Sequence, residues 1–175
     1  MYILAVLLLA LSATQAQSAM ADFIHQYVTN FFTLSEIQKI QNAVANQVCQ
    51  GATVQQMFDN FINTVSQNIG GATAVNAAAL LSKLQNDLGS DFTPIRAAAE
   101  TNAVNLFDPV VADVYQYCGQ GIPAVIGEWD NYANNPFAQS FFDAMYQAVI
   151  SVNQNDWSIC RNDFDHAVYF SNWNY

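Results

Sequence analysis

Apolar side chains recur every three or four residues along most of this 175-residue chain. That spacing gathers them on one face of an α-helix, whereas a half-buried strand needs strict alternation, which no stretch sustains. The sequence therefore predicts an all-α single domain, a bundle of about seven short-to-medium helices. The expected apolar stripes fall within residues 23–32, 37–48, 54–69, 74–88, 95–107, 110–115 and 137–152.

Capping residues mark where these helices begin. Thr33 is followed three residues later by Glu36, and Thr53 by Gln56, which is the capping-box pattern. A capping side chain before proline is typical of a helix start, because the first helical position needs no N–H donor. Three such pairs predict three further starts: Thr93-Pro94, Asp108-Pro109 and Asn135-Pro136. We also expect a short helix at 124–129 and one last turn at 157–160.

Residues 1–16 have the pattern of a secretory signal peptide. An unbroken apolar run from Ile3 to Leu11 is followed by small residues up to Ala16. The run is shorter than the roughly 20 apolar residues of a membrane span. We expect cleavage after Ala16, so that residues 17–175 form one secreted, extracellular domain.

The charge balance excludes two classes of partner. The formal net charge is −10, and only four side chains are lysine or arginine. Nucleic-acid binding needs several cations to neutralise phosphates, and anionic lipid surfaces attract basic segments. The sequence therefore predicts an acidic protein with no nucleic-acid partner and no stable membrane insertion.

Three cysteines predict one disulfide and one remaining thiol. In an oxidising compartment any two of Cys49, Cys118 and Cys160 can pair, so three pairings are open. We favour Cys118 with Cys160, which would staple the C-terminal segment to the bundle. The remaining thiol is either an inert buried group or a link between two chains in a homodimer.

The inventory of catalytic groups is small. His25 and His166 are the two histidines, and we expect His25 to be a half-exposed surface residue. No nucleophile elbow and no phosphate-binding glycine loop occurs. Cys160 lies near His166 in sequence, but an activated free thiol is a poor candidate outside the cell. The sequence predicts no enzymatic activity.

Two acidic groupings were considered as sites. Asp163, Asp165 and His166 could supply three metal ligands, yet their spacing matches no known metal-binding loop, so we interpret them as a solvated acidic turn. Glu128 and Asp130 flank Trp129, but side chains two positions apart on a helix point apart. We therefore expect no metal and no cofactor.

The aromatic content suggests a function. Helix stripes rich in phenylalanine and methionine form either a solid core or the wall of a pocket for an apolar guest. We interpret the protein as a carrier that binds a fatty acid, a retinoid or a similar small apolar ligand without catalysis. The hypothetical pocket residues are Phe31, Phe58, Phe61, Phe141 and Met145.

A structural role is the alternative. Only 10% of the residues are charged, and weakly charged surfaces resist self-association less than Lys/Glu surfaces do. The chain would then be a secreted, self-assembling protein that uses its odd cysteine to join copies. Its acidic excess would oppose assembly near neutral pH and less so as carboxylates protonate.

One stretch invites comparison with a family. From Phe23 to Ile40 an apolar helix is followed by a Thr-capped helix with an acid three residues on. This arrangement loosely resembles the opening of the nematode fatty-acid- and retinol-binding proteins, and the resemblance implies a helical lipid carrier. That family is rich in lysine and glutamate and this chain is not, so the resemblance does not assign the chain to it.

Overall fold

The computed structural model describes residues 28–133 and 137–169, and these residues are almost entirely helical. A helical segment at 28–31 comes first. The described residues confirm the prediction of an all-α, single-domain bundle. The predicted signal peptide, His25 and the Asn135-Pro136 pair lie outside the described residues. The elements are α3 (Leu34–Cys49), α4 (Val54–Asn68), α5 (Gly71–Leu88), η1 (Gly89–Asp91), α6 (Phe92–Val114), η2 (Tyr115–Gln120), α7 (Ile122–Ala133), α8 (Phe137–Ile150) and α9 (Asp156–Tyr169).

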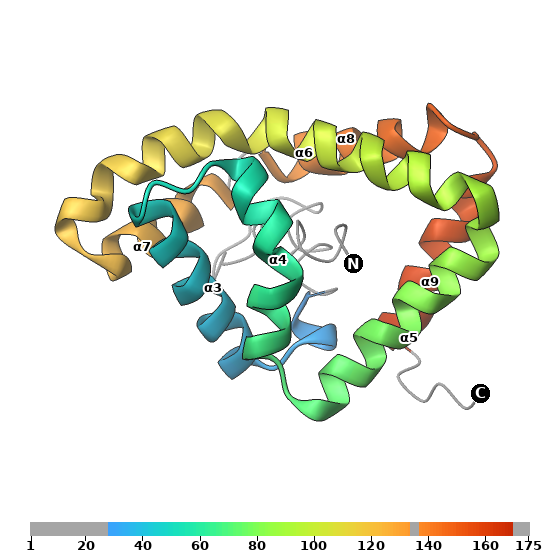
Figure 1. Ribbon diagram of the computed structural model, residues 1–175, viewed down its shortest axis with the longest axis horizontal. Helices are drawn as coiled ribbons and strands as arrows, with labels where there is room; N and C mark the ends of the chain where they lie inside the picture. The colour runs from blue at the N-terminus through green and yellow to red at the C-terminus, as the bar shows by residue number, and fades with distance from the viewer. Residues whose placement is uncertain (1–27, 134–136, 170–175) are drawn as a thin grey trace.

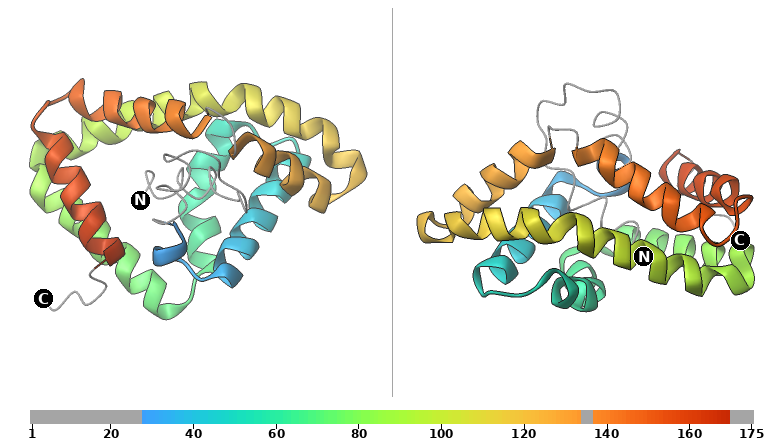
Figure 2. Two further views of the ribbon diagram at one scale, coloured as in Figure 1. Left: turned by 180° about the vertical axis from the view of Figure 1, so that it is seen from behind. Right: turned by 90° about the horizontal axis from the view of Figure 1, so that it is seen from above.

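The helices pack in pairs around a roughly triangular outline (Figure 1). Helix α6 packs most extensively against α8, and α5 against α9, while α3, α4 and α7 form the remaining corner. Seen from above, α8 lies on one side of α6 and α9 on the same side of α5 (Figure 2). Within the described ranges, no helix is long and apolar enough to cross a bilayer.

Phe107 of α6 is the centre of the aromatic core. Its ring stacks on Trp129 of α7 with centroids 5.9 Å apart, and it meets the edge of Phe137 of α8 at 5.0 Å. Phe58 of α4 and Phe141 of α8 approach the same ring at 6.4 and 6.3 Å. Such tilted and offset contacts suit the aromatic quadrupole, and the buried area stabilises the fold further. One side chain therefore joins four helices.

Both predicted capping boxes are confirmed. The Thr33 amide donates to Glu36 Oε2 at 2.8 Å, and the Thr53 amide donates to Gln56 Oε1 at 2.9 Å. Glu36 has a second role, because its carboxylate also accepts from the Gly70 amide and from the Thr73 hydroxyl at the start of α5. A single buried carboxylate thus satisfies donors at the N-termini of two helices, where the helix dipoles also favour negative charge.

These donors determine the titration of Glu36. Burial alone would raise its pKa, but hydrogen bonds from Gly70, Thr33 and Thr73 outweigh that effect and lower the pKa below its ordinary value. The ionised form is therefore the one that the folded state prefers.

The predicted helix start at Asp108-Pro109 is wrong. Pro109 lies inside α6, which continues to Val114. The reason is packing: Phe107, Val110 and Val114 are buried in register with Ile95, Ala99 and Ala103, so one apolar stripe spans the proline. Burial of that continuous stripe offsets the hydrogen bond that proline removes from a helix interior.

Other boundaries also differ from the prediction. Helix α5 begins at Gly71 rather than at residue 74, and α6 begins at Phe92, which places Thr93 inside the helix rather than at its cap. Helix α7 extends over Ile122–Ala133 rather than 124–129. The single turn predicted at 157–160 is a 14-residue helix, α9.

The disulfide joins Cys49 at the end of α3 to Cys118 in η2, with Cα atoms 5.4 Å apart. The favoured pairing of Cys118 with Cys160 is therefore wrong. Cys160 carries a free thiol that is only 3% exposed, so the prediction of one disulfide plus one buried thiol is confirmed. The pairing could not be read from the sequence, because it depends on η2 folding back beside α3.

Removal of the disulfide is expected to destabilise the protein by about 2–4 kcal/mol, because the bond closes a loop across a sequence separation of 69 residues. Urea unfolding of a Cys49→Ser/Cys118→Ser variant measures the loss. Peptide mapping under non-reducing conditions should give a linked Cys49–Cys118 pair, and a linked Cys160 peptide would contradict the structure.

Glu36→Gln is expected to lower the free energy of unfolding by about 1–3 kcal/mol at pH 7, because it weakens a buried, charge-assisted network. Since the folded-state pKa of Glu36 is lowered, its contribution is present above the ordinary carboxyl pKa and disappears as pH falls through the lowered value. Urea titrations at pH 7 and pH 3 should therefore show the gap between variant and wild type closing in acid. Glu100→Gln, at an exposed hydrogen bond to Gln55, is the matched control and should change little.

Candidate functional site

A small pocket lies where α4, α5, α6 and α9 meet, with a volume of about 60 Å³. Its walls are mainly aliphatic and aromatic, and two polar side chains complete them. The lining residues are Ile62 of α4; Leu81, Leu84, Gln85 and Leu88 of α5; Phe92, Ile95, Arg96 and Ala99 of α6; and Cys160 of α9.

Helical periodicity explains how the walls form. On α5, Leu84 and Leu88 are buried one turn apart, and Leu81 is the partly buried residue one turn before Leu84. On α6, Ile95 and Ala99 repeat the one-turn spacing and are each 2% exposed. The small Ala99 side chain fills less space than its larger neighbours in the pocket lining.

The polar part of the lining faces solvent. Gln85 and Arg96 are exposed, and Ile62 is 37% exposed, so these side chains lie where the pocket opens. The buried residues Leu84, Leu88, Ile95 and Ala99 form its depth. An apolar pocket with a few convergent polar groups is the usual form of a small-molecule site, because burial supplies affinity and polar groups supply orientation. Arg96 places a permanent positive charge at this opening.

Cys160 brings α9 into the pocket wall. Burial raises the pKa of its thiol to about 12, and the nearby charges of Asp156 and Asp163 act in the same direction. The group is therefore a neutral thiol near pH 7, which gives no support to a Cys160–His166 nucleophile. Its burial also prevents a disulfide with a second chain unless α9 moves away.

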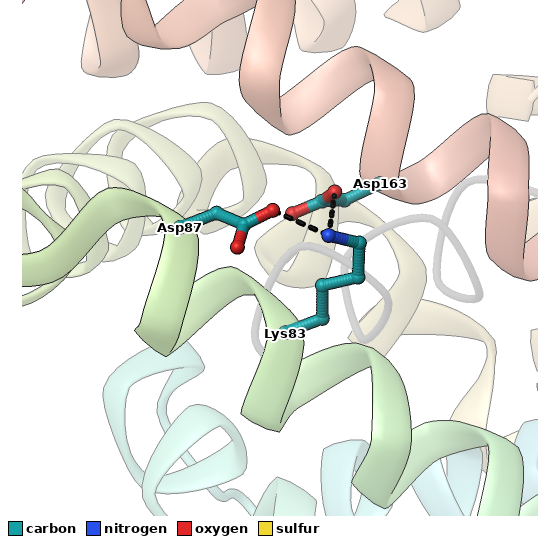
Figure 3. Close-up of polar contacts among 3 residues, drawn as sticks. All are labelled: Lys83, Asp87 and Asp163. Carbon is teal, nitrogen blue, oxygen red and sulfur yellow. Dashed lines mark hydrogen bonds and ion pairs between the residues drawn. The ribbon is translucent and has the colours of Figure 1, made fainter. Parts of the chain in front are cut away.

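Acidic groups line the seam between α5 and α9. Lys83 of α5 contacts Asp87 one turn along the same helix and Asp163 of α9, the latter at 3.3 Å (Figure 3). Asp163 is 3% exposed and its Oδ2 atom has no hydrogen-bond partner among the described residues. The predicted solvated turn at 163–166 is therefore wrong, because Asp163 is a buried residue of a helix.

A second acidic pair lies at the other end of α9. Asp156, the first residue of α9, is 5% exposed and approaches Asp91 of η1. Asp91 accepts a hydrogen bond from the Asn153 side chain at 3.1 Å, whereas Asp156 Oδ2 has no partner within the described part of the chain. Burial and the Asp91 charge both raise the pKa of Asp156.

The residues predicted to line a pocket lie elsewhere. All five are buried in the main core, and none of them contributes to the pocket described above. Phe58 and Phe141 are brought together around Phe107, while Phe31 contacts Phe32. Phe61 and Met145 are 3% and 4% exposed in the same core. Aromatic stripes marked the centre of the bundle, whereas the pocket lies beside leucine and alanine positions.

The remaining sequence candidates do not converge. Within the described ranges, no group of three or more His, Cys, Asp or Glu residues is arranged to hold a metal ion. Glu128 accepts from Asn131 at 3.1 Å on α7. Asp130 points elsewhere and burial raises its pKa to about 6, while its Oδ1 atom is buried without a hydrogen-bond partner in the described structure.

The chain matches no family model, no curated protein and no solved structure.

Asp130→Asn is expected to stabilise the protein at pH 7 by about 1 kcal/mol, because it removes a buried charge without a donor. The folded-state pKa of Asp130 is raised to about 6, so the native state favours the protonated form and the cost of ionisation grows as pH rises through that value. Urea unfolding at pH 7 and pH 4 should show the gain at pH 7 and almost none at pH 4. A gain of equal size at both pH values would contradict this explanation.

Proposed function

We propose that this protein is a secreted, non-catalytic carrier that binds a small apolar molecule bearing an anionic or polar end. The observation that supports the proposal is the pocket between α4, α5, α6 and α9, which combines apolar walls with Arg96 at its opening. Four helices contribute to it, so a ligand there would be enclosed by the bundle rather than held on one surface.

The pocket volume limits the ligand. At roughly 10–15 Å³ for each water-sized site, a volume of 60 Å³ corresponds to about four to six water sites. A short aliphatic chain fits this space, whereas a retinoid or a long-chain fatty acid would extend beyond it. Among the ligands suggested by the sequence, a fatty acid with a short or medium-length chain is thus the best match.

Secretion is part of the proposal. The apolar run of residues 3–11 has the composition of a signal peptide, and the Cys49–Cys118 bond suits an oxidising compartment. An extracellular carrier would encounter its ligand at low concentration, where enclosure by apolar walls favours binding.

Self-assembly remains a second candidate because large apolar side chains are exposed. Leu34 and Val75, near the starts of α3 and α5, are 70% and 68% exposed, and both helices begin beside the Glu36 carboxylate. Light scattering between pH 7.5 and pH 5 tests this role. A higher mass at pH 5 that Leu34→Ser/Val75→Ser abolishes would support assembly, and a monomer throughout would exclude it.

Octanoate binding tests the carrier. We expect calorimetric titration to show one site, and Ala99→Leu to weaken it at least about tenfold, because the larger side chain fills the pocket. Ala98→Leu, at a partly buried neighbour outside the pocket lining, is the matched control.

The charge of the ligand is tested separately. Arg96→Gln should weaken octanoate about three- to tenfold and leave octanol unchanged, since only octanoate carries a carboxylate. Arg161→Gln, an exposed arginine on α9 that pairs with Asp165, is the control. If wild-type protein binds neither probe at millimolar concentration, the proposed function is wrong.

A further inference from the structure

The α5–α9 seam holds more carboxylates than its cation can neutralise. Asp87 and Asp163 share Lys83, while Asp91 and Asp156 face each other with the Asn153 amide as the donor to Asp91. Asp156 and Asp163 of α9 are at least nine-tenths buried, and each has one oxygen without a hydrogen-bond partner in the described structure. A buried carboxylate oxygen without a donor is costly when ionised, and a proton on the group removes that cost.

The seam is also a wall of the pocket. Asp156, Cys160 and Asp163 are spaced by four and three residues, so they lie along one face of α9. Cys160, between the two carboxylates, lines the pocket, and Leu84 and Leu88 of α5 line it opposite. Separation of α9 from α5 would therefore remove one side of the pocket.

We propose that protons on Asp156 and Asp163 lock α9 against α5, and that their ionisation loosens α9 and opens the pocket. The consequence for the ligand rests on the proposed function, whereas the movement of α9 does not. The carrier would hold its ligand more tightly at lower pH and exchange it more rapidly as pH rises.

The direction of the pH dependence of α9 docking follows from the burial of these two carboxyl groups and from the charges that surround them. Desolvation and the Asp87 carboxylate together raise the pKa of Asp163 more than Lys83 lowers it, and desolvation with Asp91 raises the pKa of Asp156. Because the docked state binds protons more tightly, docking is strongest below the ordinary carboxyl pKa and weakens as pH rises through the docked-state value.

Other titratable groups near α9 are distinguishable from this pair. Helix α8 contributes Tyr146, whose ring meets Trp157, and the exposed Asp143, which accepts from Gln139. On α9 itself, Arg161 lies near Asp165, whose pKa is raised by burial, and His166 is exposed. Arg96 of α6 lines the same pocket as Cys160. Asp165→Asn and His166→Asn are therefore necessary controls, because both residues are ionisable groups on the same helix.

Hydrogen exchange of the full-length protein without ligand tests the lock. After correction for intrinsic rates, we expect α9 amides to be at least about tenfold better protected at pH 4.5 than at pH 7.5, with α4 as the internal reference. Asp156→Asn/Asp163→Asn should show the high protection at both pH values, since asparagine stays neutral and can donate. Asp108→Asn, an exposed position on α6, Asp165→Asn and His166→Asn should retain the wild-type response.

Asp156→Asn alone leaves the Lys83 contacts intact and is the fallback if the double variant does not fold. In this variant, the pH-dependent change in the logarithm of the α9 protection factor should be about half that of wild type, because one of the two groups no longer titrates. Equal α9 protection at both pH values in wild-type protein would overturn the proposal.

Octanol, which does not titrate, reports on the pocket. Its affinity should rise at least about threefold from pH 7.5 to pH 4.5 in wild type and stay constant in the double variant. Octanol binding with no change in α9 protection would overturn the lock and leave the carrier function intact. Protection that responds to pH in a protein that binds neither octanol nor octanoate would support the lock and overturn the carrier function.

Discussion

The packing of rings around Phe107 is the contact on which the arrangement of the helices depends. That side chain lies on α6 and touches aromatic residues of α4, α7 and α8. Helix α6 therefore connects the two parts of the bundle: the aromatic core lies toward its C-terminal end and the pocket lies beside its N-terminal end. The rigid core fixes α6, and α6 in turn supplies one wall of a softer, aliphatic site.

The protein handles buried carboxylates in two opposite ways. Glu36 receives donors from two helix starts, so it stays ionised and ties α3 to α5. Asp156 and Asp163 lie in a seam with few donors, so their pKa values rise and their ionisation costs more than it does in water. With only four lysine and arginine side chains in the chain, hydrogen-bond donors rather than counter-ions decide which carboxylates are stable as anions.

The sequence predicted the fold more fully than the site, for identifiable reasons. Local signals such as Thr33 with Glu36 act within one turn of helix, and both capping boxes formed as expected. Pro109 misled because a local helix-start signal competed with a stripe of buried residues that runs on through it, and the stripe prevailed. The helical spacing of Phe107, Val110 and Val114 was a signal that could have predicted one continuous helix through Pro109.

The site was harder to foresee because it depends on which helices become neighbours. Helix α9 buries Asp156, Cys160 and Asp163, and the polar residues among them hide the apolar periodicity that marks other helices. Leu81 lies off the buried row of Leu80, Leu84 and Leu88, which hinted at a second contact face on α5. No sequence pattern could place Cys160 opposite that face.

The position of the disulfide along the chain has a topological consequence. The bond between Cys49 and Cys118 turns the intervening polypeptide into a covalent ring that contains α4, α5 and all of α6. Three walls of the pocket belong to that ring, whereas the fourth, α9, follows the ring in the chain. The proposed movement of α9 would therefore not open the ring, and the other three walls would stay covalently connected.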